Sequence, residues 1–276
     1  MMETIIEIFS YPFMIRAVIV GVLVSLCAAL LGTSLVLKRY SMIGDGLSHV
    51  GFAALAVAYV TNLAPLSVAI PVCVLAAFLL LRMNENSKIK GDAATALMCS
   101  GALAIGIMAV SLTTGMNTDV CNYMFGSILA MSKSDVTISI ILSVVVIILF
   151  VAFYPRIFAV TFDETFAKAT GTKSDLYNMI IALLTAMTVV LGMRMMGTLL
   201  ISSLIVFPSL SAMRICKKFI TVIITSVLIS ILCFCAGIYV SYVYSTPTGA
   251  SIVIANIIVF ITFSLIEKMR ERVTQL

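Results

Sequence analysis

The side chains of this sequence that are best suited to holding a metal ion lie in one short segment, Ser41-Met-Ile-Gly-Asp45-Gly-Leu-Ser48-His49, which contains the only histidine of the chain. Asp45 and His49 are four positions apart, so in a helix that has begun by Asp45 their side chains lie on one face, one turn apart. Ser48 lies on the same side. A carboxylate beside an imidazole suits a divalent transition metal such as zinc or manganese. Two side chains form only part of a coordination shell, so other ligands must come from other helices, a second copy of the chain or water.

The same residues also have a purely structural interpretation. Asp45 would cap the N-terminus of a helix, Ser41 and Gly44 would shape the turn before it, and His49 would make one hydrogen bond. Capping does not explain a histidine one turn deeper in an apolar segment, where an ionisable side chain is costly. We therefore favour a metal site at Asp45 and His49. A secondary transporter that uses the pair as a proton relay, without any ATPase, is the alternative.

The chain that carries this segment has the composition of a membrane protein. Of its 276 residues, 62% are hydrophobic and 11% are charged, whereas soluble domains are about half apolar and about a quarter charged. A helix needs roughly 20 apolar residues to cross a bilayer, so the sequence predicts an all-α, polytopic membrane bundle of eight or nine transmembrane helices. The nine candidate spans are residues 13–36, 47–62, 64–81, 93–113, 135–153, 176–193, 197–212, 219–243 and 249–266. The second and the seventh are short for full crossings, and they could be tilted, broken or partly buried by their neighbours.

The basic residues predict the orientation of these spans. If residues 267–276 are cytoplasmic and the spans alternate, all 17 Lys and Arg residues except Arg16, Lys133 and Arg194 fall on the cytoplasmic side. Membrane topology then accounts for the formal net charge of +5, and nucleic acid is not expected as a partner. The N-terminus would be outside for nine spans and inside for eight. No linker divides the chain, so residues 1–276 are expected to form a single domain in the cell membrane.

One stretch of the cytoplasmic side, residues 155–175, looks the most like a segment of a soluble protein. Asp163 and Glu164 come early in it, Lys168 comes late and Gly171 follows, a pattern that predicts a short capped helix with its charges matched to the helix dipole. Such a helix either lies on the membrane or docks into a groove of a cytosolic partner. The residues alone leave both possibilities open.

Several enzyme classes are excluded by missing motifs. The chain has neither the H-E-x-x-H of a metalloprotease nor a G-x-S-x-G nucleophile, and it lacks the G-x-x-x-x-G-K-[ST] phosphate loop. We therefore expect it not to be an enzyme and not to hydrolyse ATP by itself. Its seven cysteines form no C-x-x-C pair and mostly fall in apolar runs, so we expect them to be small buried packing residues.

Six segments, in the order in which they occur, resemble the permease subunits of binding-protein-dependent ABC importers for zinc and manganese. They are the Lys38-Arg39 turn, GDGLSHVGFAALAVA at 44–58, MFGSILAMSKSD at 124–135, FDETFAKATG at 162–171, GMRMMGTLLISSLIVFPSLSA at 192–212 and TPTGASIVI at 246–254. The resemblance runs nearly from end to end, and the six segments in one order are more specific than any one of them.

The resemblance implies that this chain is the channel of such an importer and not its motor. Its partners would be a second copy of itself, two cytosolic ATPase subunits that carry the ATP, and an extracellular metal-binding protein. Asp45 and His49 would contact the transported ion, and no cofactor would be bound permanently. The cytoplasmic loop of residues 155–175 would hold a coupling helix, residues 163–171, that docks on the ATPase. Its partner-binding residues would be Asp163, Glu164, Phe166, Ala167, Lys168 and Gly171.

The identity of the metal is less constrained. Some related permeases draw a further acidic ligand from a later helix, whereas this sequence has no acidic residue between Asp175 and Glu267. A histidine with few hard oxygen ligands favours zinc as the cargo, with manganese and iron as alternatives.

Overall fold

The computed structural model of the chain describes residues 11–86, 91–112 and 133–274, and every regular element in these ranges is a helix. Most of the segment 124–135 that entered the resemblance lies outside the described residues. The long helices are α2 (Pro12–Leu37), α3 (Ile43–Val60), α4 (Pro65–Asn86), α5 (Gly91–Ser111), α7 (Lys133–Ala152), α10 (Ser174–Met196), α11 (Thr198–Ile215), α12 (Phe219–Tyr244) and α13 (Thr248–Thr274). Two short helices, α8 (Tyr154–Phe162) and α9 (Glu164–Ala169), lie between α7 and α10.

Nine helices of the described part are long and apolar enough to cross a membrane, one for each predicted span. The fold class is therefore confirmed, with nine candidate spans in the part of the chain that the structure describes. The two short spans correspond to α3 and α11, and burial explains their length. In α3, 72% of the spanning window is buried within the protein, and in α11 56% is buried. A helix that faces mostly protein does not need the full apolar length that lipid demands.

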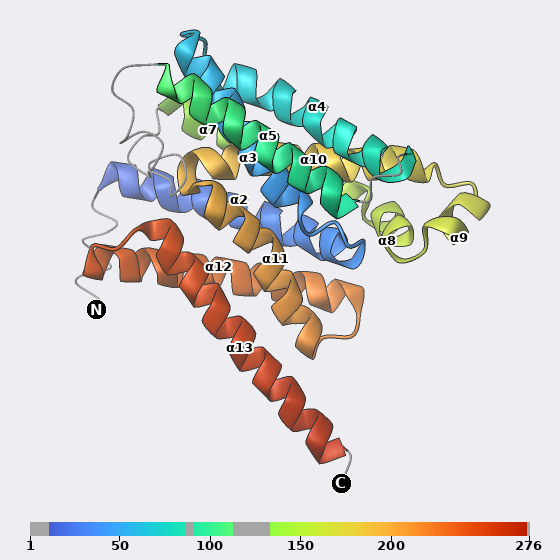
Figure 1. The fold of residues 1–276 in the computed structure, drawn as a ribbon. Coiled ribbons are helices and arrows are strands. Elements are labelled where there is room, and N and C mark those ends of the chain that lie inside the picture. Colours follow the sequence, from blue (N-terminus) through green and yellow to red (C-terminus); the bar gives the residue numbers. More distant parts are fainter. Residues whose placement is uncertain (1–10, 87–90, 113–132, 275–276) are drawn as a thin grey trace.

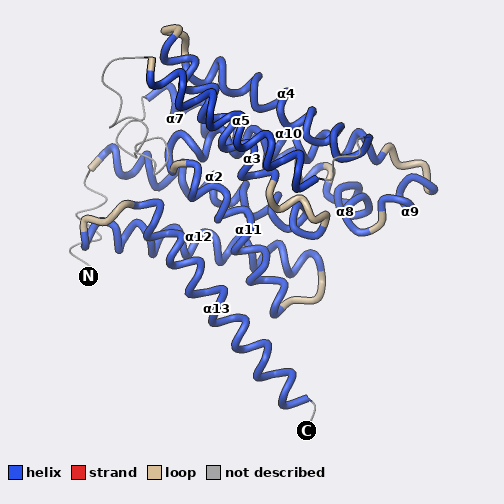
Figure 2. The backbone as a smooth tube through the Cα atoms, in the orientation of Figure 1, coloured by secondary structure: helices blue, strands red, loops and turns tan. Residues whose placement is uncertain are grey.

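The helices form a layered bundle with α3 near its middle (Figure 1). Helices α4 and α5 lie on one side, α12 and α13 lie on the other, and α2, α3, α10 and α11 lie between them, with α7 packed against α2 and α10. Helix α3 packs against α4, α5, α10 and α11, so most of its side chains are buried. The second half of α13 extends away from the rest of the bundle (Figure 1). Short loops join most of the helices (Figure 2).

Helices α2 and α11 approach each other closely at Gly32. A Cβ added to Gly32 would lie 2.0 Å from the backbone oxygen of Ile205 and 2.8 Å from Ser209 Oγ. Beside this contact, Ser209 Oγ lies 3.4 Å from Thr33 Oγ1 and 3.2 Å from Ser226 Oγ of α12. Small residues and interhelical hydroxyl pairs are the usual means of holding membrane helices together, because lipid offers no hydrophobic driving force for their association.

A single residue, Gly197, joins α10 to α11. Its φ of 84° and ψ of 164° lie in a backbone region that is essentially restricted to glycine. The chain therefore passes from α10 into α11 with no loop between them.

The predicted capped helix is present as α9. The carboxylate of Asp163 accepts a hydrogen bond from the backbone N–H of Phe166 at 2.9 Å, so Asp163 is the N-cap. After the helix, Gly171 has a φ of 83°, and the N–H of Thr172 donates to the carbonyl of Ala167 at 2.9 Å. This glycine-based ending is common at helix C-termini. The local prediction from Asp163, Lys168 and Gly171 is confirmed.

Candidate metal site

Asp45 and His49 lie on one face of α3, as their spacing predicts. Helix α3 begins at Ile43, four residues before the predicted span, and this places Asp45 in its first turn. His49 Nε2 lies 3.9 Å from Asp45 Oδ2, and the two side chains are 21% and 38% exposed, respectively. The N-cap of α3 is Met42, which makes no side-chain capping hydrogen bond. Asp45 is thus not the cap that the structural interpretation required.

A third potential ligand, Cys99, comes from α5. Its Sγ lies 3.9 Å from Asp45 Oδ2, and one ligand atom from each of Asp45, His49 and Cys99 lies within 4.8 Å of the others. A carboxylate, an imidazole and a thiol that reach a common point are suited to a divalent metal, and a thiolate favours a soft or borderline ion such as zinc. The site therefore joins two helices that the sequence places far apart.

The expectation that the cysteines are buried packing residues is wrong for exposed Cys235 and for partly buried Cys216 and Cys99, of which Cys99 lies at the site. Cys27, Cys73 and Cys233 are buried, but Cys99 is only partly buried and contacts the carboxylate of Asp45. No local pattern could have identified it, because Cys99 is separated from Asp45 by 54 positions and has no second ligand near it in sequence. Only the packing of α5 on α3 brings it to the site.

Ser202 of α11 holds the other oxygen of the Asp45 carboxylate. Its Oγ donates a hydrogen bond to Asp45 Oδ1 at 3.2 Å, while Oδ2 faces His49 and Cys99. A hydrogen bond of this kind orients a ligating carboxylate and contributes to its affinity for the metal. In this chain the later helix thus provides a hydroxyl beside the site, where the resemblance led us to look for an acidic side chain.

Glycines of α3 allow its neighbours to come close beside the site. A Cβ on Gly46 would lie 3.0 Å from Thr95 Cγ2 and 3.8 Å from Cys99 Sγ, so the missing side chain leaves room for α5. On another face, a Cβ on Gly51 would lie 2.5 Å from Met193 Cε of α10. These contacts fix the position of α3 in the bundle and with it the spacing of the three ligand atoms.

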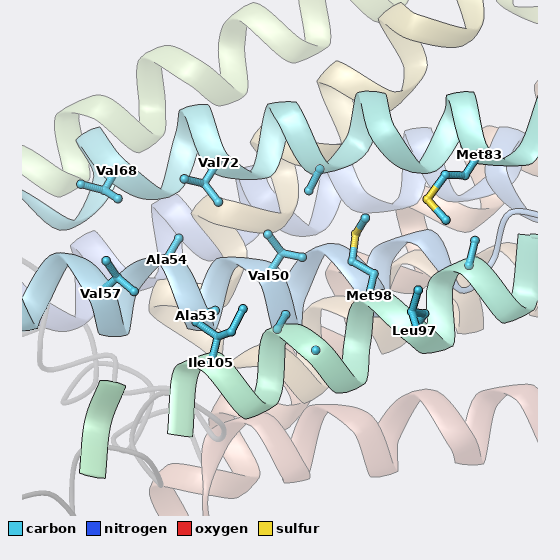
Figure 3. Close-up of a pocket in the computed structure, with 14 residues that line it drawn as sticks. Val50, Ala53, Ala54, Val57, Val68, Val72, Met83, Leu97, Met98 and Ile105 are labelled. Atoms are coloured by element: carbon cyan, nitrogen blue, oxygen red, sulfur yellow. The ribbon is translucent and has the colours of Figure 1, made fainter. Parts of the chain in front are cut away.

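The apolar pocket between α3, α4 and α5 is a different place from this site (Figure 3). It has a volume of about 420 Å³, and its labelled side chains, such as Val50 of α3, Val72 of α4 and Ile105 of α5, are hydrocarbon. The thioethers of Met83 and Met98 are the most polar groups of its lining. A divalent cation would leave its water without gaining charged ligands there, so the pocket does not compete with Asp45, His49 and Cys99 as the metal site.

The predicted partner-binding residues gather around α9, but they face different ways. The ring of Phe166 is 65% exposed, whereas Ala167 is buried in a small cluster with Val160 and Tyr177. Asp163 and Gly171 shape the two ends of the helix. Within residues 163–171, Phe166 is therefore the large apolar side chain that is exposed, and Phe162 just before them is exposed as well.

Charged side chains tie α9 to the rest of the bundle. Lys168 Nζ lies 3.1 Å from Glu164 Oε1 and 3.0 Å from Asp175 Oδ1, and these contacts raise the pKa of Lys168. Partial burial acts to raise the pKa of Glu164, but hydrogen bonds from Lys168 and Asn178 and the charges of Lys38 and Lys168 outweigh it. The pKa of Glu164 therefore lies below its usual value, and its carboxylate stays ionised at neutral pH.

The chain is similar to proteins of one transport family over nearly its whole length. The model of the ABC 3 transport family matches residues 10–267. The manganese import system permease protein ScaB of Streptococcus gordonii is 27% identical over 97% of this chain and 96% of its own length. The high-affinity zinc uptake system membrane protein ZnuB of Haemophilus influenzae is 25% identical over 94% of this chain and 99% of its own length.

A solved structure has the same fold. PsaBC from Streptococcus pneumoniae in complex with Fab contains a chain that is 26% identical, with a TM-score of 0.85 and coverage of 95% of both chains. The arrangement of helices described above is therefore shared with a protein of known structure.

Proposed function

Because this chain belongs to the ABC 3 transport family, we propose that it is the membrane permease of an ATP-driven zinc importer, in which Asp45, His49 and Cys99 hold the ion during its passage. The chain is a multi-pass protein of the plasma membrane. The observation that carries the proposal is the convergence of three ligand atoms from α3 and α5 within 4.8 Å of one another, in a bundle otherwise built of apolar helices.

The choice of zinc over manganese depends on Cys99. The relatives named above are a manganese import system permease protein and a zinc uptake system membrane protein, so the family alone is compatible with either metal. Thiolate and imidazole ligands suit zinc, whereas manganese is better served by carboxylate, carbonyl and water oxygens. A site in which Asp45 is joined by His49 and Cys99 supplies one carboxylate and two softer ligands, and this set supports zinc.

We infer the other components of the importer from the same family resemblance. ATP hydrolysis is supplied by separate cytosolic ATPase subunits, an extracellular metal-binding protein delivers the ion, and a second copy of the chain completes the channel. Residues 163–171 dock on the ATPase, and the exposed ring of Phe166 and the charged side chains around α9 support this part of the proposal.

The test of the metal is uptake of radioactive zinc and manganese by the complete transporter in lipid vesicles. We expect the native chain to favour zinc, and Cys99→Ser to lower that preference by about tenfold because a hard hydroxyl replaces the soft sulfur. Cys235→Ser is the matched control, since Cys235 is an exposed cysteine of α12. Native uptake of manganese that excess zinc does not inhibit would refute a zinc importer. An unchanged zinc-to-manganese ratio in Cys99→Ser would remove Cys99 from the ligand set.

Docking on the ATPase makes a separate prediction at Phe166. We expect Phe166→Ala to weaken binding of the ATPase by about 2 kcal/mol, roughly 30-fold in affinity, because an exposed aromatic anchor commonly dominates a protein interface. Co-purification of the ATPase with the tagged chain over a range of ATPase concentrations measures the change. Phe13→Ala provides the control, since Phe13 is exposed at the start of α2. Equal co-purification of the two variants would contradict docking through Phe166.

A further inference from the structure

Lys38 connects the turn between α2 and α3 to both α9 and α10. It is the C-cap residue of α2, and its side chain is only 7% exposed. Its Nζ lies 3.4 Å from Glu164 Oε2 of α9 and donates a hydrogen bond to Oδ1 of Asn178 in α10, which is itself buried. Moving this ammonium away would leave a buried amide without its donor and a carboxylate without part of its neutralising charge. The turn is therefore held in place relative to α9.

The surroundings of Lys38 are tightly packed. The cavity beside it measures about 10 Å³, room for no more than one water molecule. Its lining comes from the end of α2, the turn, the start of α3, α4 and α10, and includes Leu35, Tyr40, Ile43, Leu81 and Asn178. A displacement of Lys38 therefore has to move the turn with it, because the side chain has no free space in which to reorient.

The turn that follows Lys38 is short and closed by hydrogen bonds. The N–H of Tyr40 donates to the carbonyl of Leu35 at 2.8 Å, and Arg39 between them has a φ of 61°, which is the Schellman ending of a helix. The N–H of Ile43 then donates to the carbonyl of Tyr40 at 3.0 Å, and α3 begins. Asp45 lies in the first turn of that helix. From Lys38 to Asp45 the backbone is thus a continuous hydrogen-bonded segment.

We propose that Lys38 is a positioning residue that transmits movement of α9 to Asp45 and so couples the ATPase to the metal site. The inference rests on the proposed function, since it needs α9 to be the segment on which the ATPase acts. When α9 moves, Glu164 moves with it, and the ion pair carries the α2–α3 turn along. The first turn of α3 then shifts Asp45 relative to Cys99 on α5 and Ser202 on α11. This shift changes the distances between the atoms that hold the ion. Coupling of this kind requires a packed, continuous connection between two sites.

Uncoupling of transport from ATP hydrolysis is the signature of this role. The experiment uses the complete transporter in lipid vesicles and measures, in the same sample, the metal taken up and the ATP hydrolysed, with zinc and manganese each as substrate. We expect Lys38→Met to lower the metal transported per ATP by about tenfold, while ATP hydrolysis and metal binding stay near native values. Lys38→Arg should restore most of the ratio because it keeps the charge. Lys173→Met is the matched control, since Lys173 is an exposed lysine at the start of α10.

A second variant keeps the inference testable if Lys38→Met folds poorly. Glu164→Gln keeps the length of the side chain and removes its charge, so it should lower the same ratio. The double variant should be no worse than the more severe single one, because residues that act through one contact are not additive. Additive losses, or a Lys38→Met transporter with a native ratio, would overturn the role of Lys38 and leave the importer intact. A native transporter that moves neither zinc nor manganese would overturn the proposed function and the coupling together.

Discussion

We expect Asp45→Asn and His49→Ala each to abolish metal import while the chain remains folded in the membrane. Asp45→Asn keeps the shape of the side chain and removes the charge that compensates the cation, and His49→Ala removes the nitrogen ligand. Loss of an outer-shell partner alone typically weakens a metal site by about 10- to 100-fold, so loss of a ligand should lower uptake by at least about 100-fold. Elemental analysis of cells grown at limiting zinc, with the variants expressed at equal level, measures the effect.

The control for these variants lies on the same helix. Ser48 is fully buried, and its Oγ donates to the backbone oxygen of Asp45 at 2.7 Å, not to the carboxylate. Ser48→Ala changes the interior of α3 without removing a ligand, so it should retain most of the import. If both Asp45→Asn and His49→Ala accumulated zinc at the native rate, the site would have to be sought elsewhere in the chain.

Gly32→Ala is expected to prevent correct folding of the bundle. The added methyl group would lie 2.0 Å from the carbonyl oxygen of Ile205, and a backbone atom cannot move aside as the end of a side chain can. Helices α2 and α11 would have to separate, at a cost of about 3 kcal/mol or more, and the hydroxyl contacts of Thr33 and Ser209 would be disturbed with them. The fraction of monodisperse protein in detergent and its thermal midpoint report the change.

The same substitution, glycine to alanine, is expected to have the opposite effect on stability at Gly101. A Cβ at Gly101 of α5 would meet no atom within 4 Å, so Gly101→Ala should be neutral or stabilise the helix by up to about 1 kcal/mol. Gly32→Ala and Gly101→Ala can be compared in one membrane preparation. Equal thermal midpoints for the two variants would show that the contact between α2 and α11 is looser than the structure describes.

Hydropathy predicts this fold well because it measures the apolar character that a lipid bilayer requires of a spanning helix. Each span must satisfy its own backbone hydrogen bonds and be apolar over the thickness of the bilayer, so each of the nine candidate spans corresponds to a long helix among the described residues. One boundary that differs is the start of α3, which lies at residue 43 and not at the predicted residue 47. Its first turn contains Asp45 and two glycines, which lower hydropathy, yet those residues are helical because α5 and α11 pack around them.

The candidate site was predictable only where its residues lie on one helix. Asp45 and His49 are one turn apart, and helical periodicity alone places them together. Cys99 and Ser202 reach the same carboxylate from other helices, and nothing in their local sequence marks them. The ion pair between Lys38 and Glu164 spans 126 positions and is likewise a result of tertiary packing. Local order was thus foreseeable, while the contacts between helices required the structure.

The single-residue connection at Gly197 determines how this chain can vary in length. An α-helix turns by about 100° per residue, so one residue inserted next to Gly197 would rotate α11 about its axis by more than a quarter of a turn relative to α10. Ser202, five positions further on, would then face away from Asp45. No loop separates Met196 from Thr198, so no loop residues are available to restore the orientation of α11 after such an insertion. Insertions and deletions should therefore be tolerated in the longer connections between other helices and rejected at this joint.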